Sequence, residues 1–367
     1  MAKKLKHTKL YDWHVANEGR MVPFAGWEMP VRYKAGPKKE HHATRNNAGL
    51  FDIHHMAKFT VSGIYTKAYL NYITTRDVSS LKINEAHYNL MCYEDGGIVD
   101  DIFIYRLPDY WLVVTNASNH KKDFVWMQAH AATYDVILKD VSNETYLLAL
   151  QGPKAIAILQ NLTDISLSNL PRFGTMEGSV NGVQTIISRT GYTGEDGVEL
   201  FFSPEHALTM WETLLQTGEP YGLEPIGLAA RDSLRFEPAF SLYGHEIGPD
   251  ITPLEARLGW AVNFNKNFIG KNALLKQKVE GITSKLIAFE MQSRSMPRKG
   301  YDVMYEGLFV GLVVTGLYAP TINKMVGHAF VPSYISKPGT ALQIIIRNQE
   351  KDAVVVRRPL YKPAYRI

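Results

Sequence analysis

The stretch Lys285-Leu286-Ile287-Ala288-Phe289-Glu290 lies just after a change in the character of the chain at about Gly281. Its branched and aromatic side chains are typical of a β-strand. Three more short runs of the same kind follow, with Gly, Pro and Asn between them, at residues 309–315, 342–346 and 353–356. Short strands separated by turn residues predict an all-β domain in the last quarter of the chain.

The first two thirds of the chain alternate between helix-like and strand-like segments. Apolar residues recur at helical spacing in residues 64–73 and 119–134. Between these segments, two short runs at residues 102–104 and 111–113 show the period of two that is typical of strands, with turn residues separating them. The sequence therefore predicts an α+β body that carries a C-terminal β domain.

The composition narrows the class of protein. A chain of 367 residues predicts two or three domains, and its 40 basic and 36 acidic residues supply no concentrated charge for nucleic acid. Cys92 is the single cysteine, so neither an intramolecular disulfide nor a cysteine-cluster metal site can form. Because the sequence has no secretory signal pattern and no apolar stretch near the ~20 residues that span a bilayer, we expect a cytoplasmic protein without a membrane partner.

Several common catalytic motifs are absent. The sequence has no G-x-G-x-x-G, G-x-x-x-x-G-K-[ST], H-E-x-x-H or G-x-S-x-G. Their absence disfavours a Rossmann dehydrogenase, a P-loop NTPase, a zincin and an α/β-hydrolase, but excludes none of them.

An acidic turn precedes one of the predicted strands, in residues 94–101 (EDGGIVDD). Its glycines permit a tight turn, and Asp100 and Asp101 then lie at the mouth of an apolar strand on opposite faces. One of them could point into a cleft as a hydrogen-bond acceptor or general base for an amine-bearing substrate. On spacing alone, solvated acids of a hairpin are the commoner outcome.

Three glycines lie close together in residues 189–199 (RTGYTGEDGVE), before a predicted strand. Such a loop lets the backbone approach a ligand closely. Tyr192 could stack on a ring there, and Glu199 could accept hydrogen bonds from a ring amide or amidine. An ordinary loop between two strands fits the spacing equally well.

Arg231 and Arg235 are four residues apart in a predicted helix, residues 227–235 (GLAARDSLR). This spacing places both arginines on one helix face, where they could hold a carboxylate ligand bidentately. Pairing with Asp232, Glu237 or another acid of the protein is the commoner use of such arginines.

Two pairs of adjacent histidines, His41-His42 and His54-His55, raise the question of a metal site. Adjacent residues of a strand point to opposite faces, and few acids flank these pairs. We therefore expect capping and core hydrogen bonds rather than a metal. Cys92 has no basic neighbour in the sequence and is expected to be a buried structural thiol.

In their order along the chain, these segments resemble the glycine cleavage system T-protein family, aminomethyltransferases that use tetrahydrofolate. Each block is short, but the ordered set runs from about Leu10 to the C-terminus. The blocks are residues 19–31 (GRMVPFAGWEMPV), 40–42 (EHH), 48–53 (AGLFDI), 96–101 (GGIVDD), 150–153 (LQGP), 191–197 (GYTGEDG), 230–235 (ARDSLR), 242–244 (LYG), 252–255 (TPLE), 258–260 (LGW) and 268–271 (FIGK).

The resemblance implies an α+β, three-domain cloverleaf of the T-protein type around a central folate-binding opening. A discontinuous first domain would join residues 1–52 to 144–250, with a second α+β domain, residues 53–143, inserted between them. Residues 251–282 would connect these to a C-terminal β-barrel or jelly-roll-like domain, residues 283–367. This last domain matches the all-β region predicted above.

The resemblance also implies a reaction. Family members transfer the methylene of an aminomethyl group, carried on the lipoyl arm of H-protein, to tetrahydrofolate and release ammonia. H-protein would be a transient partner. An acidic lipoyl-bearing surface could be steered by Lys38, Lys39, Arg294, Arg298 and Lys299, although solvated basic loops are the alternative.

The implied site residues follow from the matched positions. Asp100 occupies the position of the family's key acid beside the reacting folate nitrogens, where a carboxylate orients amines and stabilises positive charge. Glu199 matches the acid that contacts the pterin edge, since a carboxylate can accept two donors. The other positions matched to folate contacts are Met56, Tyr88, Tyr192, Arg231 and Tyr365. No metal is implied.

The sequence departs from the usual family residues at His54, Ala57, Asn89 and residues 237–240 (EPAF), and Phe240 would fall near the central opening. Because the fold alone does not name the one-carbon donor, a tetrahydrofolate-dependent demethylase of a small methylated metabolite is an alternative. A non-catalytic folate-binding maintenance protein is a second alternative, of another class. Its typical Lys-Gly-Cys-Tyr signature is missing here, and the retained acidic motif favours catalysis.

Overall fold

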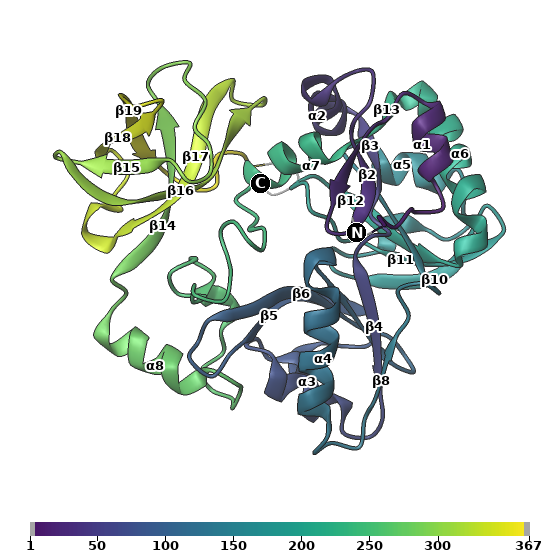
Figure 1. Ribbon diagram of the computed structural model, residues 1–367. Helices are drawn as coiled ribbons and strands as arrows, with labels where there is room; N and C mark the ends of the chain where they lie inside the picture. The colour runs from purple at the N-terminus through teal and green to yellow at the C-terminus, as the bar shows by residue number, and fades with distance from the viewer. Residues whose placement is uncertain (1–3, 363–367) are drawn as a thin grey trace.

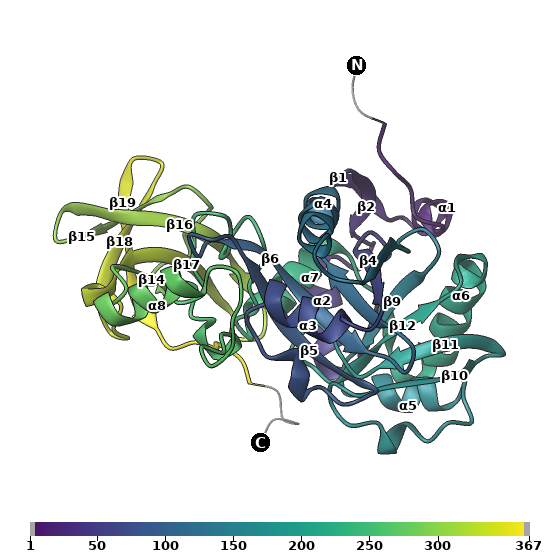
Figure 2. The same cartoon turned by 90° about the horizontal axis from the view of Figure 1, so that it is seen from below.

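The computed structural model describes residues 4–362, and Figure 1 shows them folded into three lobes. One lobe is a barrel at the upper left, and the other two are mixed sheets and helices at the upper right and at the bottom. Figure 2, turned by 90°, shows the barrel set to one side of the other two lobes. The predicted α+β body with an all-β C-terminal domain is confirmed.

The first lobe holds a six-stranded sheet in the order β10-β11-β12-β9-β3-β13. All neighbours are antiparallel except β13 and β3. The strands are β3 (Ala48–Asp52), β9 (Tyr146–Gln151), β10 (Thr175–Val180), β11 (Val183–Ser188), β12 (Gly197–Phe202) and β13 (Leu223–Pro225). Around them lie α1 (Tyr11–Ala16), α2 (Pro37–Asn46), α5 (Ala155–Gln160), α6 (Ala207–Gly218), α7 (Leu228–Phe236) and the hairpin β1 (Arg20–Phe24) and β2 (Trp27–Arg32).

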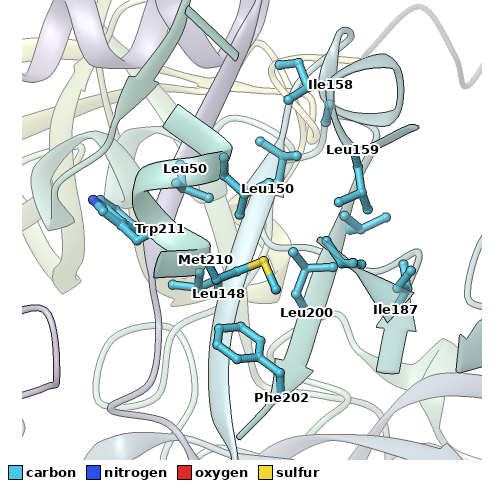
Figure 3. Packing of buried hydrophobic residues seen from close by; sticks show 14 of the residues in the cluster. Leu50, Leu148, Leu150, Ile158, Leu159, Ile187, Leu200, Phe202, Met210 and Trp211 are labelled. Atoms are coloured by element: carbon cyan, nitrogen blue, oxygen red, sulfur yellow. The ribbon is translucent and has the colours of Figure 1, made fainter. Parts of the chain in front are cut away.

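Strand β9 is buried on both faces, which explains its unbroken apolar sequence. On one face, Leu148 and Leu150 pack with Trp211 of α6 in the core shown in Figure 3. On the other face, Leu147 packs with Leu234 of α7. The sheet thereby fixes the position of α7, which carries part of the site described below.

The second lobe is a five-stranded antiparallel sheet in the order β5-β6-β7-β4-β8. Its strands are β4 (Ala57–Ser62), β5 (Glu85–Cys92), β6 (Ile98–Arg106), β7 (Trp111–Thr115) and β8 (Ile137–Asp140), and its helices are α3 (Thr66–Ile73) and α4 (His120–Ala131). Ile102 and Ile104 of β6 share an apolar core with residues of α3 and α4. One face of β6 is therefore covered by helices.

The third lobe is a closed antiparallel barrel in the order β14-β17-β16-β15-β18-β19. Its strands are β14 (Ser284–Met291), β15 (Asp302–Tyr305), β16 (Leu308–Ala319), β17 (Lys324–Pro332), β18 (Ala341–Ile346) and β19 (Gln349–Val356), and α8 (Lys271–Glu280) precedes them. The four strands predicted from sequence correspond to β14, β16, β18 and β19. Strands β15 and β17 were not predicted.

Short 3₁₀ helices join many of these elements. They are η1 (Val78–Ser80), η2 (Ala117–Asn119), η3 (Leu167–Asn169), η4 (Pro204–His206), η5 (Glu219–Tyr221), η6 (Gly259–Ala261) and η7 (Ser333–Ile335). Within residues 4–362, no helix has the length and apolar character needed to cross a membrane. The domain limits given above stay a prediction.

Candidate active site

A cavity of about 750 Å³ lies between the first two lobes and is completed by chain that leads to and from the barrel. Its volume is within the range of about 300–1,000 Å³ that is usual for small-molecule sites. Strands β5 and β6 of the second lobe form one part of its wall, and β12, α7 and their loops form another. Residues 256–260 and the chain just after β19 complete it. The cavity thus draws on segments far apart in the sequence.

Most of the predicted folate contacts meet in this cavity. The five that line it are Met56, Tyr88, Tyr192, Glu199 and Arg231. All five side chains are half-buried, as expected for a cavity wall. Tyr365, the remaining predicted contact, lies outside the described residues.

Asp100 lies elsewhere, and its neighbour Asp101 lines the cavity. Asp100 is completely buried on the side of β6 that faces α4, where Asn119 donates a hydrogen bond to it. This differs from the prediction that Asp100 faces the ligand. The physical reason is the alternation of side chains along a strand, which turns Asp101 to the face opposite Asp100.

Asp101 is held at the wall by Asn116, the residue that follows β7. Nδ2 of Asn116 donates to Oδ1 of Asp101 at 2.6 Å and to its backbone oxygen at 3.3 Å. Burial is the largest cause that raises the pKa of Asp101 to about 7. A carboxyl group with this pKa exists in both protonation states near neutral pH, which suits it to proton transfer.

Glu199 of β12 lies at another part of the wall. The hydroxyl groups of Tyr105, at 3.0 Å, and of Thr190 both donate to its Oε2. Burial raises the pKa of Glu199, and these two hydroxyl groups act in the opposite direction. Because both bonds go to Oε2, Oε1 is the oxygen that they leave for a ligand donor.

Aromatic rings and one guanidinium group form a third part of the wall. The Tyr192 ring stacks on Phe240, with centroids 5.8 Å apart and planes 21° apart. The Arg231 guanidinium lies 4.9 Å from the centre of the Tyr192 ring, on the same wall. Among the described residues, no acid forms an ion pair with Arg231, so its charge is available to a ligand oxygen.

Arg235 does not share this role. It is 1% exposed and pairs with Glu246 at 2.7 Å and with Asp232 at 2.8 Å. Of the two arginines placed on one helix face by their spacing, one therefore lines the cavity and the other is paired with protein acids. The sequence pattern allowed both uses.

Several lining residues were not identified from the sequence. They are His55, Phe103, Tyr105, Asn116, Arg172, Phe173, Arg257, Trp260 and Arg358. Strand pairing could have found some of them, because Tyr88 pairs directly with Phe103 and opposite residues of an antiparallel pair share a face. If Tyr88 faces the cavity, Phe103 faces it too, and so does Asp101, which lies two residues before Phe103 on the same strand face.

Of the paired histidines, His41 and His54 make structural contacts, and His55 lines the cavity. His41 and His42 lie in helix α2, not on a strand, and His41 bonds the hydroxyl groups of Ser233 and Thr321, each at 2.8 Å. His54 stacks on Tyr146 at a centroid distance of 4.2 Å. The part of the chain that the structure describes has no cluster of three or more His, Cys, Asp or Glu suited to a metal ion.

Cys92 is fully buried in the structure. Burial raises the pKa of its thiol well above the usual range. A thiol in that state is a poor nucleophile, as expected for a structural cysteine.

Comparisons with known proteins agree with this geometry. The family model "GCVT N-terminal domain" matches residues 10–266, and "Glycine cleavage T-protein C-terminal barrel domain" matches residues 285–362. A protein named Aminomethyltransferase from Alkaliphilus metalliredigens (strain QYMF) is 44% identical over 365 residues, covering 98% of this chain and 99% of that protein. Another with that name, from Herpetosiphon aurantiacus, is 47% identical over 365 residues, covering 99% of this chain and 100% of that protein.

A solved structure is also similar over the full length. The crystal structure of glycine cleavage system aminomethyltransferase T from Bartonella henselae matches with a TM-score of 0.92 and 33% sequence identity, covering 98% of this chain and 99% of that chain. These relatives do not favour the demethylase or the maintenance-protein alternative. The chain belongs to the glycine cleavage T-protein family of aminomethyltransferases.

Proposed function

We propose that the protein transfers the methylene of an aminomethyl group from the lipoyl arm of H-protein to tetrahydrofolate bound in the central cavity. The observation that carries this proposal is the convergence of Asp101, Glu199, Arg231 and aromatic rings on one cavity of about 750 Å³. An acid, a ring-edge acceptor, a cation and stacking surfaces match the parts of a reduced pterin with an acidic tail.

The cavity residues fit folate chemically. Oε1 of Glu199 can accept from the amino group and ring N–H of an amino-pyrimidinone. Tyr192 supplies a ring face, with Tyr88 and Met56 as further walls. Arg231 can donate to carbonyl or carboxylate oxygens of the ligand.

In the proposed reaction the C–S bond of the aminomethyl-lipoyl group breaks, and N5 of tetrahydrofolate forms a bond to the methylene carbon. The C–N bond to the amine then breaks, and N10 closes the 5,10-methylene bridge. The two hydrogens lost from N5 and N10 end on ammonia and on the dihydrolipoyl thiol, so atoms balance. Asp101, rather than Asp100, is assigned the role of orienting the amines, stabilising the developing cation and passing a proton.

H-protein would approach the opening of this cavity. Among the candidate basic residues, Lys299 has the best supported position, because its Nζ donates to the backbone oxygen of Gly244. Both neighbours of that glycine, Tyr243 and His245, line the cavity. Lys38 lies 5.6 Å from the centre of the Tyr318 ring, close to the barrel. A cytoplasmic location stays a prediction.

The proposal is tested by supplying purified protein with tetrahydrofolate and aminomethyl-loaded H-protein, and measuring methylenetetrahydrofolate and ammonia together. We expect equal amounts of both products. Asp101→Asn should lower kcat by about 100-fold or more while the Kd for tetrahydrofolate changes little. Asp109→Asn, at an exposed turn of the same sheet, is the matched control and should behave as wild type.

Two outcomes would contradict the proposal. Folate binding without product would transfer the assignment to a small methylated donor. Full turnover by Asp101→Asn would remove that carboxylate from the chemistry.

A further inference from the structure

Asp100 makes an unusually complete set of hydrogen bonds for a residue outside the cavity. Its Oδ1 accepts from Nδ2 of Asn116 at 2.9 Å and from Nδ2 of Asn119 at 2.8 Å. Its Oδ2 accepts from the backbone N–H of Asn116 at 3.1 Å. The side chain is completely buried, so these bonds are not exchanged with solvent.

The same Asn116 amide also contacts Asp101. Its Nδ2 donates to Oδ1 of Asp101 at 2.6 Å and to Oδ1 of Asp100 at 2.9 Å. An amide NH₂ group has two hydrogens, and one is directed to each carboxyl group. The opposite orientation of the amide would place its oxygen against two carboxyl groups, so the contact with Asp100 selects the orientation that supports Asp101.

Charged and titratable groups surround Asp100 on its buried side. Asp123 of α4 is also fully buried and faces Asp100, and Nζ of Lys122 lies 3.4 Å from Oδ1 of Asp123. The other titratable groups that interact with it electrostatically are Tyr93 and, from the side of the cavity, Asp101, Tyr88 and Tyr243. Burial, and then the neighbouring Asp123, raise the pKa of Asp100 well above its usual range.

Two adjacent buried carboxyl groups with one nearby lysine are most stable when they share a single proton. As a neutral acid, Asp100 can give its proton to Asp123 in a hydrogen bond while its carbonyl oxygen accepts from Asn116 and Asn119. This arrangement leaves Asp101 as the acid of the pair that changes charge at the cavity.

We propose that Asp100 is a positioning residue of the transfer reaction, a neutral acceptor that holds the Asn116 amide so that this amide fixes Oδ1 of Asp101 at the cavity wall. The inference rests on the proposed function, because it takes Asp101 as the acid that faces the folate. It assigns different tasks to two successive acids of one strand.

Two substitutions at Asp100 separate this role from a catalytic one. Asp100→Asn keeps an acceptor oxygen and can still donate to Asp123, so kcat should stay within about threefold of wild type. Asp100→Ala removes both acceptor oxygens, and misplacement of Asp101 should lower kcat by about 10- to 100-fold. The Kd for tetrahydrofolate should change by less than about twofold in either variant.

The pH profile supplies a readout that a general packing defect would not move. Asn116 donates to the ionised form of Asp101, so loss of this bond should raise the acid limb of kcat/KM by about half a pH unit in Asp100→Ala. Asp100→Asn should restore the wild-type limb. Ile104→Val, which removes one methylene group from the core on the same face of β6, is the packing control and should leave the limb in place.

A double-mutant cycle tests whether the effect passes through Asn116. If it does, Asp100→Ala combined with Asn116→Ala should be no slower than Asn116→Ala alone. Should Asp100→Ala fail to fold, Asn116→Ala alone must move the acid limb upward, and an unmoved limb overturns the inference.

The remaining outcomes of these experiments also test the inference. An Asp100→Ala variant with wild-type kcat and pH profile overturns the inference but leaves the proposed function standing. An Asp100→Asn variant as slow as Asp101→Asn shows that the charge of Asp100 is itself needed. A wild-type protein that forms no methylenetetrahydrofolate refutes the proposed function and this inference together.

Discussion

Glu199 shows how hydroxyl groups prepare a carboxylate for a ligand. Tyr105 and Thr190 both donate to Oε2, which holds the side chain in place in the cavity wall and leaves Oε1 without a bond from either hydroxyl group. The same two hydroxyl groups favour the ionised form against the effect of burial. The acceptor is therefore fixed before any ligand arrives, and less freedom is lost on binding.

Replacing this acceptor should weaken folate binding. We expect Glu199→Gln to raise the Kd for tetrahydrofolate by about 10-fold or more, because hydrogen bonds to a charged group are worth about 1.5–3 kcal/mol. Equilibrium titration of the two proteins measures the change. Glu177→Gln, an exposed position on β10 of the same sheet, is the control. Equal affinity of Glu199→Gln and wild type would mean that the pterin edge binds elsewhere.

The titration of Asp101 should be visible in the rate. Burial raises its pKa to about 7, so the ionised form that stabilises a cation is lost as the pH falls below this value. We expect kcat/KM to drop about tenfold per pH unit on the acid side of pH 7. Asp101→Asn should lack this limb. A wild-type profile that stays flat down to pH 5 would contradict the assignment.

At the scale of the element, strand β6 separates what the sequence can and cannot predict. The alternation of a strand predicts that Asp100 and Asp101 face opposite sides, and they do. Alternation cannot decide which side is the cavity, because that depends on which face the helices α3 and α4 cover. Because Tyr88 lines the cavity and pairs with Phe103, the face of β6 that carries Phe103 and Asp101 is the one toward the cavity. This pairing is a contact between two strands, which the alternation of one strand does not contain.

Other elements show the same limit. Strand β17 contains Gly327, against which the Phe289 ring packs so closely that a Cβ there would lie 2.3 Å from a ring carbon. The packing of the neighbouring strand requires this glycine, and a glycine weakens the strand pattern of the segment in which it lies. Likewise, the hydrogen-bond partners of His41, Ser233 and Thr321, lie far from it in the sequence, so a local pattern cannot predict them. The ordered motifs of the family predicted the three lobes and five of the residues that line the cavity.

The turn before β6 supplies a prediction at this scale. A Cβ on Gly97 would lie 1.7 Å from the backbone oxygen of Pro249, so Gly97→Ala must displace the turn or the segment beside it. We expect a loss of about 1–3 kcal/mol in the free energy of unfolding, measured by denaturant titration. Gly248→Ala, where a Cβ meets no atom within 4 Å, should stay within about 0.5 kcal/mol of wild type. Equal stability of the two variants would contradict the close approach.

At the scale of the whole molecule, two buried acids join the barrel to the first lobe. Glu237, at the end of α7, accepts from the backbone N–H of Thr321 at 2.9 Å and binds Arg45 at 3.0 Å. Glu246 binds Arg235 at 2.7 Å and the barrel residue His328 at 2.9 Å. Both contacts cross from residues near α7 to the barrel, so they hold the lobes in the arrangement that encloses the cavity.

Loss of the Glu246 charge should loosen this junction. Burial acts to raise the pKa of Glu246, but Arg235 holds it well below its usual range. Its stabilising contribution is therefore present above the pKa of an ordinary glutamate and is lost as the pH falls toward the lowered value. We expect Glu246→Gln to lose about 3–5 kcal/mol of unfolding free energy at neutral pH, because the buried Arg235 loses its buried partner and keeps only the exposed Asp232.

A matched control lies on the barrel itself. Glu290 pairs with the exposed Lys324 at 2.7 Å, and Glu290→Gln should cost less than about 1 kcal/mol. Calorimetric unfolding of the three proteins measures both effects. If the two variants lost equal stability, the Glu246 cluster would not hold the lobes together.

Because the cavity wall joins the first two lobes to the chain just after the barrel, ligand binding and the assembly of these parts are coupled in one equilibrium. A ligand that touches all parts of this wall binds only when they are assembled, so by mass action it stabilises the assembled state. At one hundred times its Kd, such a ligand adds about 2.7 kcal/mol to the assembled state. The lifetime of the protein in a cell, and its resistance to proteases, would then follow the supply of the molecule on which it acts.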